Sequence, residues 1–253
     1  SGFNGTSERT EWDDVATANA VLHSGNIPHF IDIDPKTVMI EPDGLRHYLS
    51  TICQIKNKHT INKKTGRRLL CLVAVDFLGN PSTSEELKAV CSEFGIGFMM
   101  DCAEALGSYR NGQHTGMQAE AAALSFNGNK IITTGSGGAV LTNSEKLHKK
   151  ISHRSKTAKL PIAHEFIHDE LGFNYRMAAL NAALGCAQLK KLDKYLNNKA
   201  NLYQIPYKNM VRYMFEMPDD ASFEMLYGNL KAQDTISFWS TSFIRGTTID
   251  NAI

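Results

Sequence analysis

The sequence lacks an excess of charge of one sign. Its 27 lysines and arginines stand against 26 aspartates and glutamates, so the formal net charge over 253 residues is only +1. No basic face stands out over a long stretch. Neither nucleic acid nor an acidic membrane surface is therefore the expected partner.

Paired cysteines and long apolar runs are missing as well. The five cysteines are odd in number, widely spaced and form no CxxC pair. That pattern argues against a disulfide framework and a zinc ribbon, and it fits a reducing compartment. No apolar run approaches the length of a membrane span, and no charged start leads into the apolar core of a secretory signal. We therefore expect a cytoplasmic protein.

The pattern that is present alternates strands with helices. Apolar runs at 69–75, 96–100, 121–126 and 138–142 are typical of buried parallel strands, and a further strand is expected at 27–33. Helices are expected at 15–22, 42–53, 82–94, 143–153 and 177–192, with Ser82 and Glu85 as a capping box and Asn143 as a cap. The polar connector at 54–68 predicts a hairpin or surface loop. The alternation predicts an α/β domain with a mostly parallel sheet, whose ligands bind beyond the carboxyl ends of strands.

Two residues that follow such strands carry possible chemistry. Asp101 ends an apolar strand, where an acid is costly unless it meets a cation or good donors. It is either a cap or turn former, or the carboxylate that keeps the pyridine nitrogen of pyridoxal phosphate protonated. Lys130 lies between a strand containing Ser125 and the glycine-rich stretch 135–138. Partial desolvation there would lower its pKa, as a lysine that attacks an aldehyde requires.

Two other motifs point elsewhere. The stretch 135–138 fails the dinucleotide pattern GxGxxG, because Val140 stands where the third glycine should be and a strand follows instead of a helix. His164 and His168 match HExxH, which on a helix could bind zinc with Glu165 as the base. No third ligand follows at a familiar spacing. A zinc hydrolase therefore stays open as a less favoured alternative.

Several segments together resemble the sugar aminotransferases of the DegT/DnrJ/EryC1/StrS family, which are pyridoxal phosphate enzymes of fold type I. The resemblance covers residues 15–192, and its motifs are specific through their order and spacing. They are 16–21 (ATANAV), 25–28 (GNIP), 101–108 (DCAEALGS), 112–116, 125–130 (SFNGNK), 134–138 (TGSGG), 172–177 (GFNYRM), 181–183 and 188–189. The stretches 62–66 and 167–170 look most like the branch that acts on UDP-linked 4-keto-6-deoxy amino sugars of the bacillosamine and legionaminic type.

The resemblance implies a role for each matching residue. Lys130 would carry the cofactor covalently and shuttle the proton, and a neighbouring subunit would share the site, which implies a homodimer. The implied cofactor contacts are Asp101 (pyridine nitrogen), Glu104 (near the ring oxygen), Ser125 (phosphate), Asn174 (phosphate of the neighbouring subunit's cofactor) and Gly5 with Thr6 (phosphate).

The chain departs from the family pattern at several positions. Family members are longer, and an aromatic residue that stacks on the cofactor ring is missing, with Trp12 the nearest. Asp76 and Asn80 stand where this branch has histidine-like residues. We expect a large cofactor-binding domain at 1–192, a partial small domain at 193–253, and a mostly parallel mixed sheet flanked by helices. We also expect the chain to be incomplete.

The expected function is the transfer of an amino group, from glutamate, to a nucleotide-linked 4-keto-6-deoxy sugar. The main alternative is a catalytically degenerate relative that keeps the fold for binding or assembly. A dehydratase on the same fold is disfavoured, because dehydratases of the family have histidine where Lys130 stands.

Overall fold

The computed structural model describes residues 15–34, 37–162 and 164–203. The chain divides into two compact units. The first comprises residues 1–124 and 139–176, and the second comprises residues 125–138 and 177–253. The division into domains after residue 192 stays a prediction, because most of the second expected domain lies outside the described residues.

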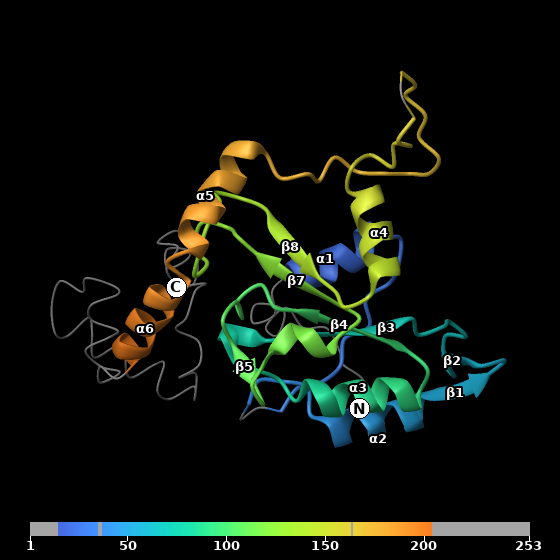
Figure 1. The fold of residues 1–253 in the computed structure, drawn as a ribbon. Helices are drawn as coiled ribbons and strands as arrows, with labels where there is room; N and C mark the ends of the chain where they lie inside the picture. Colours follow the sequence, from blue (N-terminus) through green and yellow to red (C-terminus); the bar gives the residue numbers. More distant parts are fainter. Residues whose placement is uncertain (1–14, 35–36, 163, 204–253) are drawn as a thin grey trace, which may run out of the picture. The chain divides into compact units, whose positions relative to one another are not determined.

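A four-stranded sheet organises the first unit (Figure 1). Its order is β3 (Cys71–Val75), β4 (Gly97–Asp101), β7 (Ala121–Ser125) and β8 (Gly138–Leu141). β4 runs parallel to β3 and to β7, with Asp101 opposite Val75 on one side and Ala123 on the other. The four apolar runs therefore form strands as predicted, and the α/β fold class is confirmed.

The core of this unit lies between the sheet and helices α2 (Pro42–Ile52) and α3 (Ser84–Glu93). On α3, Leu87 and Val90 are completely buried, and Met100 of β4 is 1% exposed. Each such side chain contributes about 1.5–3 kcal/mol by leaving water. In the sequence, Leu87, Val90, Cys91 and Phe94 lie at helical spacing and predict one apolar face, and the first three of them are buried.

The predicted capping box of α3 is wrong. The helix begins after Thr83, whose side chain makes no capping hydrogen bond. The backbone N–H of Ser82 instead donates to Oδ1 of Asp76 at 2.9 Å. The carboxylate of Asp76, six residues earlier in the chain, thus accepts the N–H that Glu85 would accept in a capping box.

The connector between α2 and β3 is a hairpin, as predicted. Strands β1 (Cys53–Lys56) and β2 (His59–Asn62) pair antiparallel. Asn57 and Lys58 form the turn with positive φ angles of 53° and 63°. The remaining short elements of the unit are η1 (Phe77–Gly79), β5 (Tyr109–Arg110), β6 (Gln113–His114) and η2 (Thr115–Gln118).

The strand expected at 27–33 is not formed. Helix α1 (Val15–His23) ends as predicted near Gly25, which has a φ of 76°. The chain then runs on without a partner strand in the described sheets, and Ile27 and Phe30 are 60% and 42% exposed. A strand depends on a neighbour that accepts its backbone hydrogen bonds, which residue types alone do not supply.

Helix α4 (Glu145–Arg154) is capped one residue later than predicted. The Ser144 hydroxyl accepts a hydrogen bond from the N–H of Leu147 at 3.2 Å. The Asn143 amide instead donates to the carbonyl of Met117 at 3.0 Å. Asn143 therefore binds the loop at Met117, and the neighbouring Ser144 caps the helix.

The second unit contains segment 125–138, α5 (Ala179–Leu189) and α6 (Leu192–Tyr203). The single helix expected at 177–192 is thus shorter and is followed by a second helix. Helix α5 buries no residue completely, and its Leu180 is 87% exposed. The apolar residues at 236–244 also predict a strand, and they lie outside the described residues. Among the helices that the structure describes, none is long and apolar enough to cross a membrane.

Candidate functional site

Asp101 is held by two hydrogen-bond donors at the end of β4. Its Oδ1 accepts from the N–H of Ala103 at 3.0 Å, and its Oδ2 accepts from the Thr17 hydroxyl of α1 at 2.5 Å. The first bond is a local turn contact, which is one of the two roles that the sequence allows for Asp101. The second comes from a segment 84 residues away. The acid therefore meets good donors, as a strand-end carboxylate should.

Glu104 holds a second loop in place. Its Oε2 accepts from the N–H of Leu78 at 2.9 Å. Leu78 has a φ of 59°, which is uncommon for a residue other than glycine. A Cβ at the next residue, Gly79, would lie 3.0 Å from the Glu104 carbonyl oxygen. The Glu104 carboxylate therefore stabilises a strained turn against the segment that follows β4.

Asp76 directly follows β3, much as Asp101 ends β4, and in the sequence it stands out only as a departure from the family pattern. Its side chain is completely buried, and its Oδ2 lies 3.7 Å from the Sγ of Cys102, which is also completely buried. Burial, and then the nearby Asp76 carboxylate, raise the pKa of the Cys102 thiol to about 12. The thiol also lies 3.6 Å from the Thr115 hydroxyl. Asp76 could have been recognised in the sequence, since an acid directly after the apolar run 69–75 repeats the pattern of Asp101.

In the second unit, Lys130 closes a short turn that begins at Ser125. The Ser125 hydroxyl accepts from the N–H of Asn127 at 3.3 Å. The Lys130 N–H donates to the carbonyl of Asn127 at 3.1 Å. The Lys130 side chain is half-buried. The lysine thus lies in a short turn that follows β7.

Helix α5 fastens the return limb of the Lys130 turn. The N–H of Thr133 donates to Oε1 of Gln188 at 2.8 Å, and the Asn181 amide donates to the carbonyl of Thr134 at 2.5 Å. Gly185 permits this approach, because a Cβ there would lie 2.7 Å from Cγ2 of Thr134. The sequence showed these α5 residues as motif matches without indicating this role.

The glycine-rich stretch 135–138 forms a tight turn. Gly135 and Gly137 have φ angles of 82° and 102°, a conformation that favours glycine. The Gly137 carbonyl accepts from the N–H of Phe126 at 2.9 Å. The two limbs of segment 125–138 are therefore hydrogen-bonded to each other around Lys130.

Asn174 lies in a stretch that two ion pairs tie to α4. It forms a backbone bridge to Lys156. Arg154 pairs with Glu170 through two nitrogens, and Nε2 of His153 lies 2.6 Å from Oδ1 of Asp169. The hydrogen bonds from His153 and Arg154 lower the pKa values of Asp169 and Glu170 respectively. These contacts set the path of the chain that presents Asn174.

The HExxH segment does not adopt the helix that a zinc motif requires. His164 has a φ of 65°, and residues 165–168 form no helix. Nδ1 of His168 lies 2.6 Å from the carbonyl oxygen of Thr157. The two histidines therefore do not share a helix face, and the zinc hydrolase interpretation loses its geometric basis.

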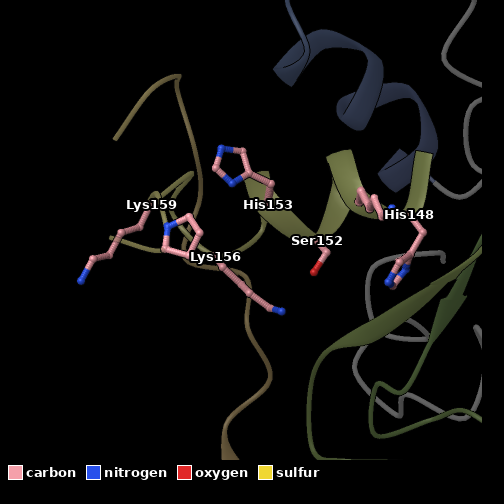
Figure 2. A pocket seen from close by; sticks show the side chains of 7 residues that line it. His148, Ser152, His153, Lys156 and Lys159 are labelled. Atoms are coloured by element: carbon pink, nitrogen blue, oxygen red, sulfur yellow. The ribbon is translucent and has the colours of Figure 1, made fainter. Parts of the chain in front are cut away.

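A basic hollow of about 300 Å³ lies along α4 and the segment after it (Figure 2). Figure 2 shows His148, Ser152 and His153 on the helix and Lys156 and Lys159 beyond it. His153 is already paired with an acid, and Nζ of Lys159 lies 3.7 Å from the centre of the Phe166 ring. The hollow contains none of the predicted site residues.

The predicted site residues fall into separate groups. Asp101, Glu104 and Asn174 belong to the first unit, and Ser125 and Lys130 belong to the second. Gly5 and Thr6 lie outside the described residues. Within the first unit Asp101 and Glu104 lie on one turn, and within the second Ser125 and Lys130 lie on another.

Comparison with known proteins gives this arrangement a context. The model of the DegT/DnrJ/EryC1/StrS aminotransferase family matches residues 11–218. The chain is 33% identical over 196 residues to the GDP-perosamine synthase of Escherichia coli O157:H7, covering 78% of this chain and 49% of that protein. It is also 33% identical over 180 residues to the UDP-4-amino-4,6-dideoxy-N-acetyl-beta-L-altrosamine transaminase of Helicobacter pylori, covering 70% of this chain and 43% of that one. The chain thus spans about half the length of these relatives.

A solved structure agrees with the sequence comparison. The Helicobacter pylori aminotransferase PseC, involved in the biosynthesis of pseudoaminic acid, superposes with a TM-score of 0.66 at 28% identity. The match covers 83% of this chain and 50% of PseC. The order of the motifs, the sheet and the family match lead to one conclusion. The chain belongs to the DegT/DnrJ/EryC1/StrS aminotransferase family.

Proposed function

We propose that the chain acts as a pyridoxal phosphate-dependent sugar aminotransferase. In this proposal it transfers an amino group from glutamate to a nucleotide-linked 4-keto-6-deoxy sugar, in the cytoplasm. The observation that carries the proposal is the half-buried Lys130 in a turn hydrogen-bonded on both limbs, within a chain that matches an aminotransferase family. Two relatives at 33% identity are named for products or substrates that are nucleotide-linked amino sugars.

The residues present fit the cofactor chemically. Pyridoxal phosphate offers an aldehyde, a pyridine nitrogen and a phosphate, and the chain offers the Lys130 amine, the Asp101 carboxylate and the Ser125 hydroxyl. Next to Lys130, the buried Oδ1 of Asn129 has no hydrogen-bond partner within the described part of the chain. A buried acceptor of this kind favours a site in which a bound group supplies the missing donor.

When bound, the cofactor supplies an electron sink that stabilises negative charge on the carbon that loses a proton. Lys130 carries the proton, since its Nζ removes it from the donor carbon and returns one to the sugar carbon. Asp101 would hold the pyridine nitrogen in its protonated form, and Glu104 would lie near the ring oxygen. Ser125, Gly5 and Thr6 would bind the phosphate.

Asn174 extends the proposal to a homodimer. In it, Asn174 reaches the phosphate held by the neighbouring subunit, so each site needs two chains. The ion pairs of Arg154 with Glu170 and of His153 with Asp169 fix the stretch that carries Asn174. Sedimentation or light scattering that finds only monomers at micromolar concentration would contradict this part.

Covalent trapping tests the proposal directly. The chain is mixed with pyridoxal phosphate, reduced with borohydride, digested and mapped by mass spectrometry. We expect the pyridoxyl group on Lys130, and no such label in a Lys130→Ala variant. Lys146→Ala removes an exposed lysine of α4 and serves as the matched control, because it should label like the unchanged chain.

Turnover then separates the enzyme from a degenerate relative. The enzyme should give labelled amino sugar from ¹⁵N-glutamate and a UDP-linked 4-keto-6-deoxy sugar, and Lys130→Ala should give none. The absence of both the Lys130 label and the product would support the degenerate relative that keeps the fold for binding or assembly. Labelling at another lysine would overturn the assignment of Lys130.

A further inference from the structure

The hydrogen bond between Thr17 and Asp101 has no counterpart among the functional contacts assigned above. It joins α1 to the end of β4 over 84 residues, with 2.5 Å between the hydroxyl oxygen and Oδ2. Since a carboxylate has no proton to give, the Thr17 hydroxyl is the donor. Charge-assisted hydrogen bonds of this length are among the strongest in proteins.

The two donors on Asp101 fix the carboxyl group as a unit. The N–H of Ala103 binds Oδ1 and the Thr17 hydroxyl binds Oδ2, so each oxygen accepts one hydrogen bond. Rotating the carboxyl group about its terminal torsion, which is broad when unrestrained, would break at least one of them. The local bond alone would leave Oδ2 free to move, and Thr17 removes that freedom.

The contact is specific in its setting. Helix α1 buries no residue completely, and Thr17 is itself only partly buried. Apolar packing therefore does little to place Thr17, and the hydroxyl provides a directional attachment of α1 to Asp101. Asp101 is proposed to pair with a pyridine nitrogen. A directional hydrogen bond to its carboxylate therefore affects the orientation of that group as well as the stability of the fold.

We propose that Thr17 is a positioning residue for Asp101. It orients the carboxylate so that a free lone pair points at the pyridine nitrogen of the cofactor, and it holds that orientation when the cofactor leaves. The inference rests on the proposed function, since it needs Asp101 to face that nitrogen. Thr17 acts through Asp101 and takes no part in the chemistry itself.

The test compares variants that keep or lose the donor. Thr17→Val has a similar shape without the hydroxyl, whereas Thr17→Ser keeps the hydroxyl without the methyl group. Thr51→Val is the matched control, because Thr51 is an exposed residue of α2 and its hydroxyl donates to the His47 carbonyl of the same helix. Two readouts are used, namely the dissociation constant of pyridoxal phosphate by absorbance titration and the ¹⁵N chemical shift of its labelled pyridine nitrogen.

We expect Thr17→Val to weaken cofactor binding about tenfold to hundredfold, the range that follows from losing a hydrogen bond to a charged group. The ¹⁵N shift should move toward the unprotonated value. Thr17→Ser and Thr51→Val should stay within about threefold of the unchanged chain and keep its ¹⁵N shift. Rescue by serine would show that the hydroxyl is responsible and the methyl group is not.

Several results would overturn the proposal. One is a Thr17→Val protein that melts normally and keeps both the affinity and the ¹⁵N shift of the unchanged chain. Another is a Thr17→Ser protein as impaired as Thr17→Val, which would assign the effect to packing. If Thr17→Val fails to fold, the test rests on Thr17→Ser, which should keep the ¹⁵N shift of the unchanged chain. A changed ¹⁵N shift in Thr17→Ser would then contradict the proposal. An unchanged chain that binds no cofactor would refute the proposed function and this inference together, whereas normal binding with an indifferent Thr17→Val refutes only the inference.

Discussion

Gly116 is the residue whose substitution gives the most direct test of packing behind Asp101. A Cβ added there would lie 2.7 Å from the Cβ of Ala122 and 3.2 Å from the Sγ of Cys102. Ala122 is 1% exposed and lies opposite Met100 in the β4–β7 pair, so it cannot yield without moving β7. Gly116 itself does not have a positive φ, so alanine meets no backbone strain. The whole effect of Gly116→Ala should therefore come from the clash.

The magnitudes can be worked out for a double-mutant cycle. Gly116→Ala should lower the free energy of unfolding by about 1–3 kcal/mol, the usual cost of overpacking. Ala122→Gly should cost about 1–2 kcal/mol, from one lost methyl group and the greater backbone freedom of glycine in a strand. The double variant removes the clashing methyl group. It should lose only about 1–2 kcal/mol and so be no worse than Ala122→Gly alone.

Urea denaturation followed by circular dichroism measures the four proteins, and thermal melting checks the order at roughly 2–4 °C per kcal/mol. Gly128→Ala is the control, because no atom lies within 4 Å of a Cβ there and its unfolding should change little. Strict additivity of the Gly116 and Ala122 effects would refute the reasoning. It would mean that β7 and η2 do not touch at these two positions.

Three further predictions concern other parts of the chain. Gln188→Met removes the acceptor of the Thr133 N–H and should speed hydrogen exchange of that amide about tenfold. Gln188→Glu keeps an acceptor oxygen and should leave the exchange rate unchanged. Equal exchange rates in the two variants would contradict the contact. The hydrogen bond from Arg154 lowers the pKa of Glu170, so this ion pair stabilises the fold above the ordinary carboxyl pKa of 4.5, and the stabilisation is lost as pH falls through the lower pKa of the folded state. Proteolysis of residues 156–174 should therefore increase at that low pH. The Glu170→Gln variant should be cleaved readily already at neutral pH. The Cys102 thiol, with its pKa raised to about 12, should resist iodoacetamide at pH 8 in the folded chain and react in urea. Rapid labelling mapped to Cys102 itself in the native protein would show that it is not buried, whereas the exposed Cys71 and Cys186 should label in both states.

The sequence predicted those elements whose cause is local. Continuous apolar runs gave the four strands, and helical spacing gave the buried face of α3 around Leu87. The strand expected at 27–33 failed because no partner strand pairs with it in the described sheets. The capping box at Ser82 failed because Asp76, six residues earlier, accepts the Ser82 N–H in place of Glu85.

In the candidate site, too, residues with a local sequence pattern could be predicted and long-range contacts could not. Asp101 and Lys130 were recognisable because each follows an apolar strand, a property that the sequence displays directly. Their supports were not, since Thr17 contacts Asp101 over 84 residues and Gln188 contacts Thr133 over 55. Such contacts follow from the path of the backbone, which no short motif records.

The strand order in the described sheet also bears on how the chain folds during synthesis. Strands β3, β4, β7 and β8 stand side by side in the order in which a ribosome makes them. Each new strand therefore adds to an open edge and never has to insert between two strands that are already paired. β3 and β4 can pair, covered by α3, once residue 101 has emerged, and β4 then waits as an unpaired edge for the 20 or so residues before β7 arrives. During that interval the edge of β4 is the surface most exposed to pairing with another nascent chain.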